Sequence, residues 1–245
     1  MRYTAKTDIG LKRENNEDCL FAKIYDEENA LFIVADGLGG YSSGEIASQT
    51  VTKNIREGFE EKLDVLKSGE KKKVKEYLSK IVLNANEKVY SMQTGEPKYK
   101  GMGTTIVLVA KISGNIYYLS IGDSRLYYVD KRKENIEQIT VDDTYVNELL
   151  KKNLIKEEEA EKHPQKHVLT KALGIFSKLE IKVHDFYKTE GYLILCSDGL
   201  TNMLKDEEIL EKLLVTPEDK IAEKYVNEAN AKGGKDNITV IVVEI

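Results

Sequence analysis

The 245-residue sequence contains few of the residues that build covalent or soft-metal sites, with only two cysteines and three histidines. Cys19 and Cys196 belong to no CxxC or CxxxxxR pattern, which argues against a disulfide framework, a cysteine zinc site and thiol chemistry. We expect both to be small buried hydrophobic residues. The histidines are scattered along the chain, so a zinc site built from clustered His ligands is also not expected.

Long apolar runs and concentrated basic segments are missing too. No stretch approaches the roughly 18 residues that span a membrane, and the first ten residues hold no apolar signal core, so we expect a soluble, cytoplasmic protein. The basic residues number 37 against 42 acidic ones and are spread out. This pattern argues against nucleic acid as a main ligand. No repeat, linker or low-complexity tract divides the chain, and its length suits one domain covering 1–245.

Four predicted strands carry an aspartate at one end. The stretch 30–40, ALFIVADGLGG, is a near-continuous apolar run that stops at Asp36 and gives way to glycines. Similar runs lead into Asp123 and Asp198, and Asp236 precedes the last run. If these strand ends lie together, their carboxylates repel strongly unless a cation sits between them. Oxygen-only ligands favour hard ions such as Mg²⁺ or Mn²⁺.

Two such ions that share a carboxylate about 3.5 to 4 Å apart can activate water for in-line displacement at phosphorus, which indicates a phosphate-ester hydrolase. Each feature alone has a structural alternative. Asp36-Gly37 and Asp198-Gly199 also suit hairpin turns, and Arg13 with its acidic neighbours Glu17 and Asp18 suits a surface ion pair. The glycines after Asp36 fit neither GxxxxGK[ST] nor GxGxxG. Only the joint occurrence points to the metal site.

The element pattern predicts an α+β fold. Ser42 and Glu45 form a capping-box start for a helix with an apolar stripe, and a second helix covers Lys71–Met92. A helix capped by Asp206 and another beginning at Thr216-Pro217 follow near the end. About nine to eleven short, mostly antiparallel strands accompany them, including 104–111, 115–121, 125–130, 179–186 and 192–197. Consecutive helix pairs favour a four-layer sandwich of two mostly antiparallel β-sheets flanked by pairs of α-helices.

An irregular insertion at 141–174 interrupts the strands. It contains two short helical patterns, at 144–152 and 157–162, and is longer than most connections. Insertions of this kind are often lids or binding loops, and a plain surface excursion is the alternative.

Six motifs, in order along essentially the whole chain, resemble those of the metal-dependent protein phosphatase 2C family, specifically its compact bacterial single-domain members. The motifs are Gly10–Asp18, Asp36–Gly40, Gly103–Thr105, Ile121–Arg125, Ser197–Leu200 and Lys235–Thr239. The resemblance implies that Asp36 bridges two Mn²⁺ or Mg²⁺ ions, that the Gly37 carbonyl binds the second ion, and that Asp198 and Asp236 hold the first.

The same resemblance assigns roles around this core. Asp123, with Asp198, would bind a third, weaker ion. Glu17 and Asp18 would contact metal-bound water, and Arg13 would bind the substrate phosphate. Asn237 matches a polar residue beside the metals, and the insertion at 141–174 matches a flap that influences substrate access.

The implied activity is hydrolysis of phosphoserine and phosphothreonine in proteins by direct attack of a metal-bridging hydroxide, with Arg13 and Asp36 as catalytic residues and no phosphoenzyme intermediate. The fork of an arginine suits phosphate oxygens. Substrates would be targets of a bacterial Ser/Thr kinase, and a monomer is the default.

Leu38 stands where eukaryotic relatives carry a histidine proposed as general acid, so metal-bound water would protonate the leaving group. The flap also departs from many bacterial members, which carry a histidine after Asp142, and this departure bears on substrate preference.

Two alternatives accompany this interpretation. One is a non-catalytic regulatory module with the same fold, which would be expected to have lost several of the metal acids that are present here. The other is a phosphatase for a serine-phosphorylated anti-sigma-factor antagonist, whose family members often carry sensor or coiled-coil domains.

Overall fold

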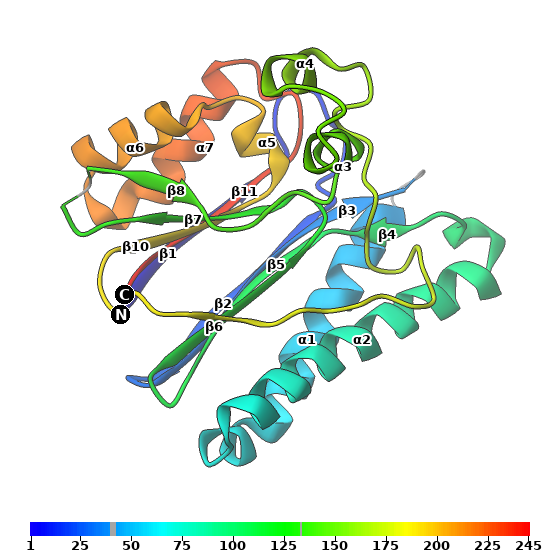
Figure 1. Ribbon diagram of the computed structural model, residues 1–245, viewed down its shortest axis with the longest axis vertical. Coiled ribbons are helices and arrows are strands. Elements are labelled where there is room, and N and C mark those ends of the chain that lie inside the picture. Colours follow the sequence, from blue (N-terminus) through cyan, green and yellow to red (C-terminus); the bar gives the residue numbers. More distant parts are fainter. Residues whose placement is uncertain (40–42, 133) are drawn as a thin grey trace.

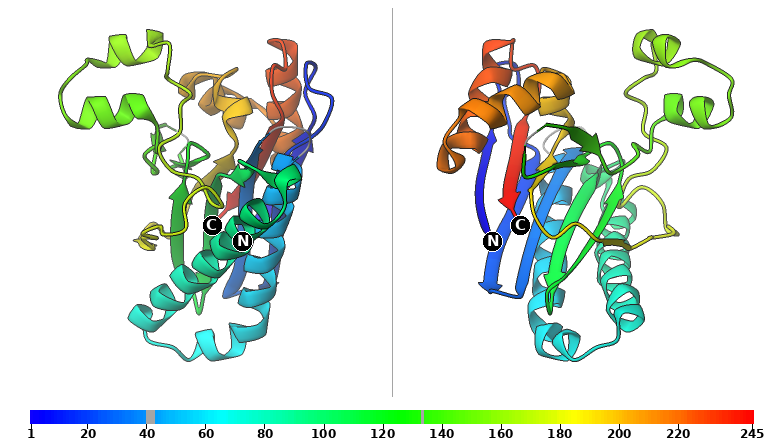
Figure 2. Two further views of the ribbon diagram at one scale, coloured as in Figure 1. Left: turned by 90° about the vertical axis from the view of Figure 1, so that its right-hand side faces the viewer. Right: turned by 60° about the vertical axis from the view of Figure 1, so that its left-hand side comes forward.

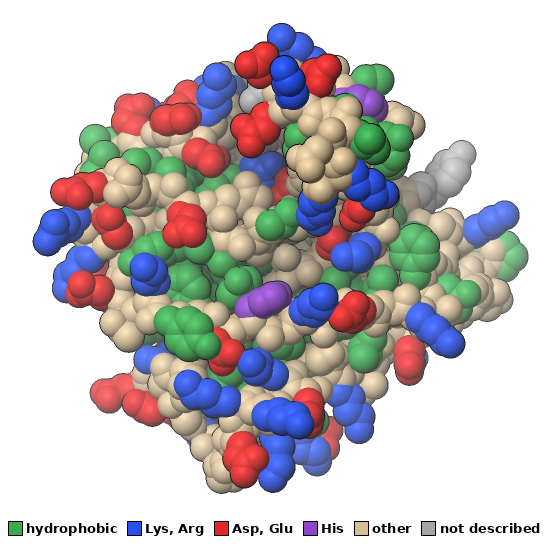
Figure 3. All heavy atoms as spheres, viewed as in Figure 1, with side chains coloured by type: hydrophobic (Ala, Val, Ile, Leu, Met, Phe, Trp, Pro, Cys, Tyr) green, Lys and Arg blue, Asp and Glu red, His purple; other side chains and the backbone are tan. Residues whose placement is uncertain are grey.

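The computed structural model describes residues 1–39, 43–132 and 134–245. Two β-sheets face each other between two layers of helices, as Figure 1 shows. The predicted α+β sandwich of antiparallel sheets and flanking helix pairs is therefore confirmed. Acidic and basic side chains are interspersed over the face in Figure 3.

All strand pairs within the two sheets are antiparallel. The first sheet has the order β1 (Arg2–Asp8), β11 (Ile238–Glu244), β10 (Tyr192–Cys196), β7 (Arg125–Val129) and β8 (Ile136–Gln138). The second has the order β2 (Asp18–Asp26), β3 (Asn29–Leu38), β5 (Ile106–Ile112), β6 (Asn115–Ile121) and β9 (His184–Phe186), with β4 (Gly103–Thr104) paired to β3.

Helices cover the outer face of each sheet. Long helices α1 (Ser43–Lys67) and α2 (Lys71–Gly95) pack on the second sheet, and α6 (Asp206–Val215) and α7 (Ile221–Ala231) pack on the first. The short helix α5 (Asp198–Thr201) follows β10, and η1 (Pro97–Tyr99) and η2 (Glu218–Lys220) are single 3₁₀ turns. The insertion forms α3 (Tyr145–Lys151) and α4 (Glu157–Lys162), which project from the sandwich in Figure 2. Across the described ranges, none of the helices has the length and apolar character needed to span a bilayer.

Three apolar cores lie between the four layers, and β3 contributes to two of them. Leu31 and Ile33 face α1 and α2, whereas Phe32 and Val34 face the other sheet. Successive side chains of a strand point to opposite faces, so a strand covered on both sides needs apolar residues at nearly every position. Because β3 is covered on both faces, the apolar run before Asp36 is unbroken. Each such buried side chain stabilises the fold by roughly 1.5 to 3 kcal/mol.

The chain changes sheets between β6 and β7. Short connections led us to expect antiparallel pairing along this whole region, and the Ser113-Gly114 hairpin between β5 and β6 confirms it there. Between β6 and β7 the expectation is wrong, because β7 pairs with β10 in the other sheet. Gly122 has φ +100° and its backbone lies so close to Thr105 that a Cβ would come within 2.7 Å of that side chain. The link bends sharply there and leaves Asp123 between the two sheets.

Several element boundaries also differ from the predictions. Strand β3 continues past Asp36 to Leu38 because its last two residues pair with β4. Lys205, not Asp206, caps α6, because the Glu208 carboxylate accepts a hydrogen bond from the Lys205 backbone N–H at 3.1 Å. The strand expected over 179–186 is limited to β9, the part that pairs with β6. The proposed cap at Ser42 lies outside the described residues.

Candidate metal and phosphate site

Acidic side chains from both sheets meet at one end of the sandwich. Asp36 in β3 lies directly opposite Asp18 in β2. Asp198 begins α5 immediately after β10, and Asp236 lies just before the neighbouring strand β11. The charges of Asp18, Asp198, Asp123 and Asp236 all act on the Asp36 carboxylate. The convergence predicted from the sequence is therefore present.

Burial and mutual repulsion raise the pKa values of these acids, so their simultaneous ionisation is unfavourable. Burial, followed by the charges of neighbouring aspartates, raises the pKa of Asp36 well above its usual value. Burial is also the main reason that the pKa of Asp18 and that of Asp123 rise to about 7. The pKa of Asp198 is raised by burial and by the charge of Asp236. Without a cation, the folded site resists holding all of its negative charges at neutral pH.

The donor set fits hard divalent cations. Asp18 Oδ1 is buried and has no hydrogen-bond partner within the described part of the chain, although a carboxylate oxygen in that position needs one. No group of three or more Asp, Glu, His or Cys side chains, among the residues described, is arranged to hold an ion alone. Mg²⁺ does not require such a group, because it keeps several waters and binds through one or two carboxylates. Asp36, Asp198 and Asp236, with a backbone carbonyl such as that of Gly37, match this requirement.

The backbone around Asp36 is fixed on both sides. The Asp36 N–H donates to Thr105 Oγ1 at 3.1 Å, and Thr104 Oγ1 donates to the Asp36 carbonyl at 2.9 Å. A Cβ on Gly37 would lie 2.2 Å from the Gly44 carbonyl oxygen, so only glycine fits. Gly37 belongs to a strand and Asp198 to a helix, so the alternative that these Asp-Gly pairs are hairpin turns is wrong.

The loop that carries Arg13 and Glu17 leads into Asp18, the first residue of β2, and lies against the same site. Arg13 Nη2 is 2.7 Å from Asp236 Oδ2, so its ion-pair partner is not one of the two acids near it in sequence. Asp18 Oδ2 accepts a hydrogen bond from Ser197 Oγ at 2.7 Å. Burial raises the pKa of Glu17, although the charge of Arg13 and a hydrogen bond from the Gly44 N–H oppose the shift.

Asn237 ties this loop to the start of β11. Its Oδ1 accepts from the Glu17 N–H at 2.8 Å, and its Nδ2 donates to the carbonyls of Ile9 and Asn15, both at 2.9 Å. The sequence placed Asn237 beside the metals but gave no sign of this role, because its partners are more than 200 residues away. Ser197 was also missed, and only its position beside Asp198 could have drawn attention to it.

The base of the insertion is anchored next to Asp123. Arg125 Nε donates to both Asp142 oxygens at 3.1 Å, and Arg125 Nη2 donates to Asp142 Oδ2 at 2.8 Å. Asp143 pairs with Lys171 at 2.7 Å and accepts a hydrogen bond from the Gly122 N–H at 3.2 Å. The unusual Asp142-Asp143 pair thus fixes the two ends of the insertion to the link between the sheets.

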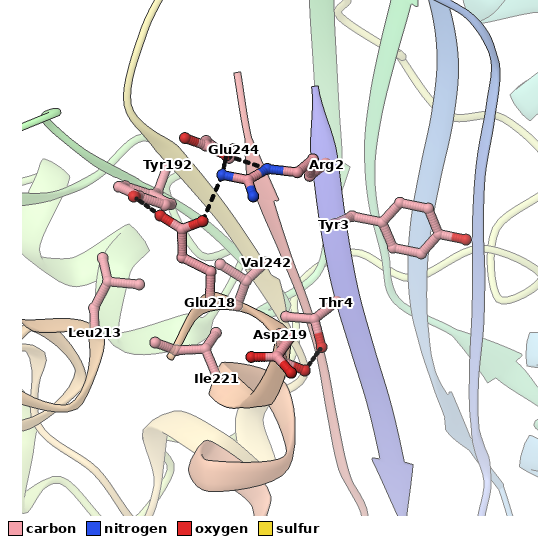
Figure 4. A pocket seen from close by; sticks show the side chains of 10 residues that line it. All are labelled: Arg2, Tyr3, Thr4, Tyr192, Leu213, Glu218, Asp219, Ile221, Val242 and Glu244. Atoms are coloured by element: carbon pink, nitrogen blue, oxygen red, sulfur yellow. Dashed lines mark hydrogen bonds and ion pairs between the residues drawn. The ribbon is translucent and has the colours of Figure 1, made fainter. Parts of the chain in front are cut away.

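Two clefts open over the acids. The larger, of about 820 Å³, lies between the insertion and α5 and reaches Asp123 and Asp198. The smaller, of about 410 Å³, reaches Asp198 and Asp236. A third pocket, of about 140 Å³, lies at the other end of β10 and β11, where Arg2 already bridges Glu218 and Glu244 (Figure 4). Because its single basic residue is already paired and it lies at the opposite end of these strands from the acids, it is not a candidate for the reaction.

Comparisons with known proteins agree with this geometry. Residues 12–235 match the family model described as protein phosphatase 2C. The chain is 34% identical over 248 residues to the serine/threonine phosphatase stp of Listeria innocua, covering 100% of this chain and 96% of that protein.

Solved structures give the same result. The Mycobacterium tuberculosis serine/threonine phosphatase PstP/Ppp superposes with a TM-score of 0.86 at 34% identity, covering 100% of this chain and 98% of that one. A catalytic domain of PstP in complex with two manganese ions has a TM-score of 0.81 at 32% identity, covering 98% and 96%. A family match over most of the chain, together with full-length relatives above 30% identity, shows that this chain belongs to the protein phosphatase 2C family.

Proposed function

We propose that this chain hydrolyses phosphoserine and phosphothreonine in proteins with the help of Mn²⁺ or Mg²⁺. The observation that carries the proposal is the meeting of buried acids from both sheets around Asp36, where burial and the charges of four neighbouring aspartates raise the pKa of Asp36 well above its usual value. Hydrolysis of a phosphate ester at such a site would require that the attacking water, the phosphorus and the leaving oxygen are held in line beside the bound metals.

Different acids of the site would bind different metal ions. When bound, two divalent cations supply Lewis acidity and lower the pKa of water. Asp36 would contact both ions, the Gly37 carbonyl would hold the second, and Asp198 with Asp236 would hold the first. Glu17 and Asp18 would orient water. Asp123, whose position between the sheets faces the large cleft, would hold a third, weaker ion.

Arg13 is suited to orient the phosphoryl group. Its side chain is half exposed, and its guanidinium lies 2.7 Å from Asp236 Oδ2. The paired N–H groups of the guanidinium match the oxygens of a phosphate, so Arg13 would hold the phosphoryl group beside the acids. Leu38, at the end of β3, offers no proton, and we expect water to protonate the leaving group.

The wider context completes the proposal. Residues 1–245 would act as one domain in which the insertion at 141–174 is a flap over the site. We expect the chain to act as a monomer in the cytoplasm on targets of a bacterial Ser/Thr kinase. Its two cysteines, neither in a disulfide, suit that compartment.

Metal removal provides the first test. With p-nitrophenyl phosphate and with a phosphothreonine peptide, we expect hydrolysis in Mn²⁺ or Mg²⁺ and a loss of at least about 10³-fold in EDTA, restored by adding the metal back. The reason is that no described side chain at the site replaces the metals as an activator of water. Hydrolysis that is equally fast in EDTA would refute the proposal, and no hydrolysis under any condition would favour the non-catalytic module.

A second test concerns Asn237 as a positioning residue. Asn237→Ala removes the bonds that hold the loop of Arg13 and Glu17, and we expect roughly 10- to 100-fold lower kcat/KM with a higher Mn²⁺ concentration for half-maximal rate. Asn54→Ala, which loses one side-chain bond within α1, is the matched control. If Asn237→Ala lowered the melting temperature but left the Mn²⁺ requirement unchanged, the residue would be only structural.

A further inference from the structure

The smaller cleft carries more positive charge than one phosphoryl group uses. Arg13 and Lys235 come from the two loops beside the acids, and Lys166 and His167 come from the flap. The acids in the same cleft are Asp198 and Asp236. Both are assigned above to metal, so neither remains to balance the basic groups when the site is loaded.

Two of these side chains, Lys166 and Lys235, have no anionic partner among the residues that the structure describes. Arg13 pairs with Asp236 at 2.7 Å. Within the described part of the chain, no ion pair is formed by Lys166 or by Lys235, although most of the flap base is paired, as in Lys171 with Asp143. Unpaired surface lysines are common, but here two of them line the same cleft from separate segments of the chain. Their shared position allows one ligand to contact both lysines.

The size of the cleft suits more than the reacting group. About 410 Å³ lies in the range of whole ligand sites. An extended peptide advances about 3.3 Å per residue, so residues up to three positions from the phosphorylated one lie within about 10 Å of it. This distance is close to the screening length at physiological salt, about 8 Å. Charges on neighbouring residues of a substrate would therefore interact electrostatically with lysines on the cleft wall.

We propose that Lys166 and Lys235 form a subsite for a second anionic group, so that the enzyme prefers phosphopeptides with an acidic or phosphorylated residue near the one it dephosphorylates. The proposal rests on the proposed function and specifies its substrate class. Arg13 orients the reacting phosphate, while the two lysines attract the neighbouring charge from the flap side and from the β11 side.

The test compares four phosphothreonine peptides of equal length that differ two positions on either side of the phosphate: neutral, with Glu, with Lys, and with a second phosphothreonine. With Mn²⁺ at about 0.1 M ionic strength, we expect kcat/KM for the Glu peptide to exceed that for the neutral peptide by about 10-fold, mainly through KM, since exposed pairs contribute roughly 2- to 5-fold each. The doubly phosphorylated peptide, with more charge, should be preferred further, and the Lys peptide disfavoured. Raising the ionic strength to about 0.5 M should shrink every difference.

Variants assign the preference to the two lysines. Lys166→Gln and Lys235→Gln should each reduce the Glu-to-neutral ratio to about 3, and the double variant to about 1, on the same scale of 2- to 5-fold per pair. The double charge reversal Lys166→Glu with Lys235→Glu should favour the Lys peptide instead. Lys152→Gln, which changes an exposed flap lysine outside both clefts, is the matched control and should keep the wild-type ratio.

The outcomes separate this inference from the activity itself. Equal kcat/KM for all four peptides, or a preference that survives in the double variant, would overturn the subsite while leaving phosphatase activity in place. Failure of the unaltered chain to hydrolyse any of the peptides would overturn the proposed function and the subsite with it.

Discussion

Asp36→Asn is expected to lower kcat/KM for a phosphothreonine peptide in Mn²⁺ by at least about 10³-fold, equivalent to about 4 kcal/mol of transition-state stabilisation. The amide keeps the shape of the carboxylate but not its charge, and one neutral oxygen cannot bridge two cations. The backbone bonds to Thr104 and Thr105 use main-chain atoms of Asp36, so the substitution leaves them intact. Asp198→Ala should cause a loss of the same order.

The same variant should be more stable than the wild type when metal is absent. Neighbouring carboxylates and burial raise the pKa of Asp36, which means that its ionised form is disfavoured in the folded chain. Removing that charge relieves repulsion, so we expect a higher melting temperature in EDTA together with the lost activity. A destabilised and inactive variant would instead indicate that Asp36 serves the fold.

Asp185→Asn is the matched control for both measurements. Asp185 lies in β9 of the same sheet and pairs with Lys75, at 2.7 Å, across to α2. Its replacement should leave hydrolysis unchanged and lower stability slightly, by up to about 1 kcal/mol. Mn²⁺-dependent activity that is retained in both Asp36→Asn and Asp198→Ala would refute the metal assignment.

The sequence predicted the layers because apolar periodicity reflects burial directly. Continuous runs marked strands covered on both faces, as β3 is, and four-residue spacing marked the buried side of α1. It did not predict that β7 leaves the sheet of β6. A short turn indicates that two strands can pair, but long-range packing decides which strand each one pairs with. Here the chain bends at Gly122, and β7 pairs with β10.

The residue types of the site and the convergence of its strand ends were predictable, but the contacts between its side chains were not. Asp36, Asp198 and Asp236 were each marked by an adjoining strand, and the fold brings those strand ends together. The partner of Arg13 was not predictable, because Asp236 lies 223 positions away and several acids, including Glu14 and Glu17, stand nearer in sequence. The support from Asn237 and the flap position of Lys166 likewise depend on contacts between distant segments, for which a single sequence carries no local signal.

Mn²⁺ is expected to raise the melting temperature of the metal-free chain by about 5 to 10 °C at pH 8 and by less than about 3 °C at pH 5. Metal at 100 times its dissociation constant contributes about 2.7 kcal/mol, and each kcal/mol shifts the melting temperature of a chain of this size by about 2 to 4 °C. At pH 5 protons occupy much of the site and compete with the metal.

The sign of this effect follows from the raised pKa values. Asp18 and Asp123 each have a pKa of about 7 in the folded, metal-free chain, against 3.8 for an ordinary aspartate. Between about pH 4 and pH 7 the folded state therefore binds more protons than the unfolded state, so the free energy of unfolding that these groups contribute falls as the pH rises. Most aspartates act in the opposite direction, because partners usually lower their pKa.

Thermal unfolding in EDTA and in excess Mn²⁺, measured at several pH values between 5 and 8, tests this expectation directly. The gap between the two melting curves should widen as the pH rises toward 8, and Asp36→Asn, which lacks the bridging charge, should show little gap at any pH. A gap of equal size at pH 5 and pH 8 in the wild type would mean that the metal does not relieve repulsion among these acids. In that case the convergence of the strand ends would have to be explained by something other than the binding of hard cations.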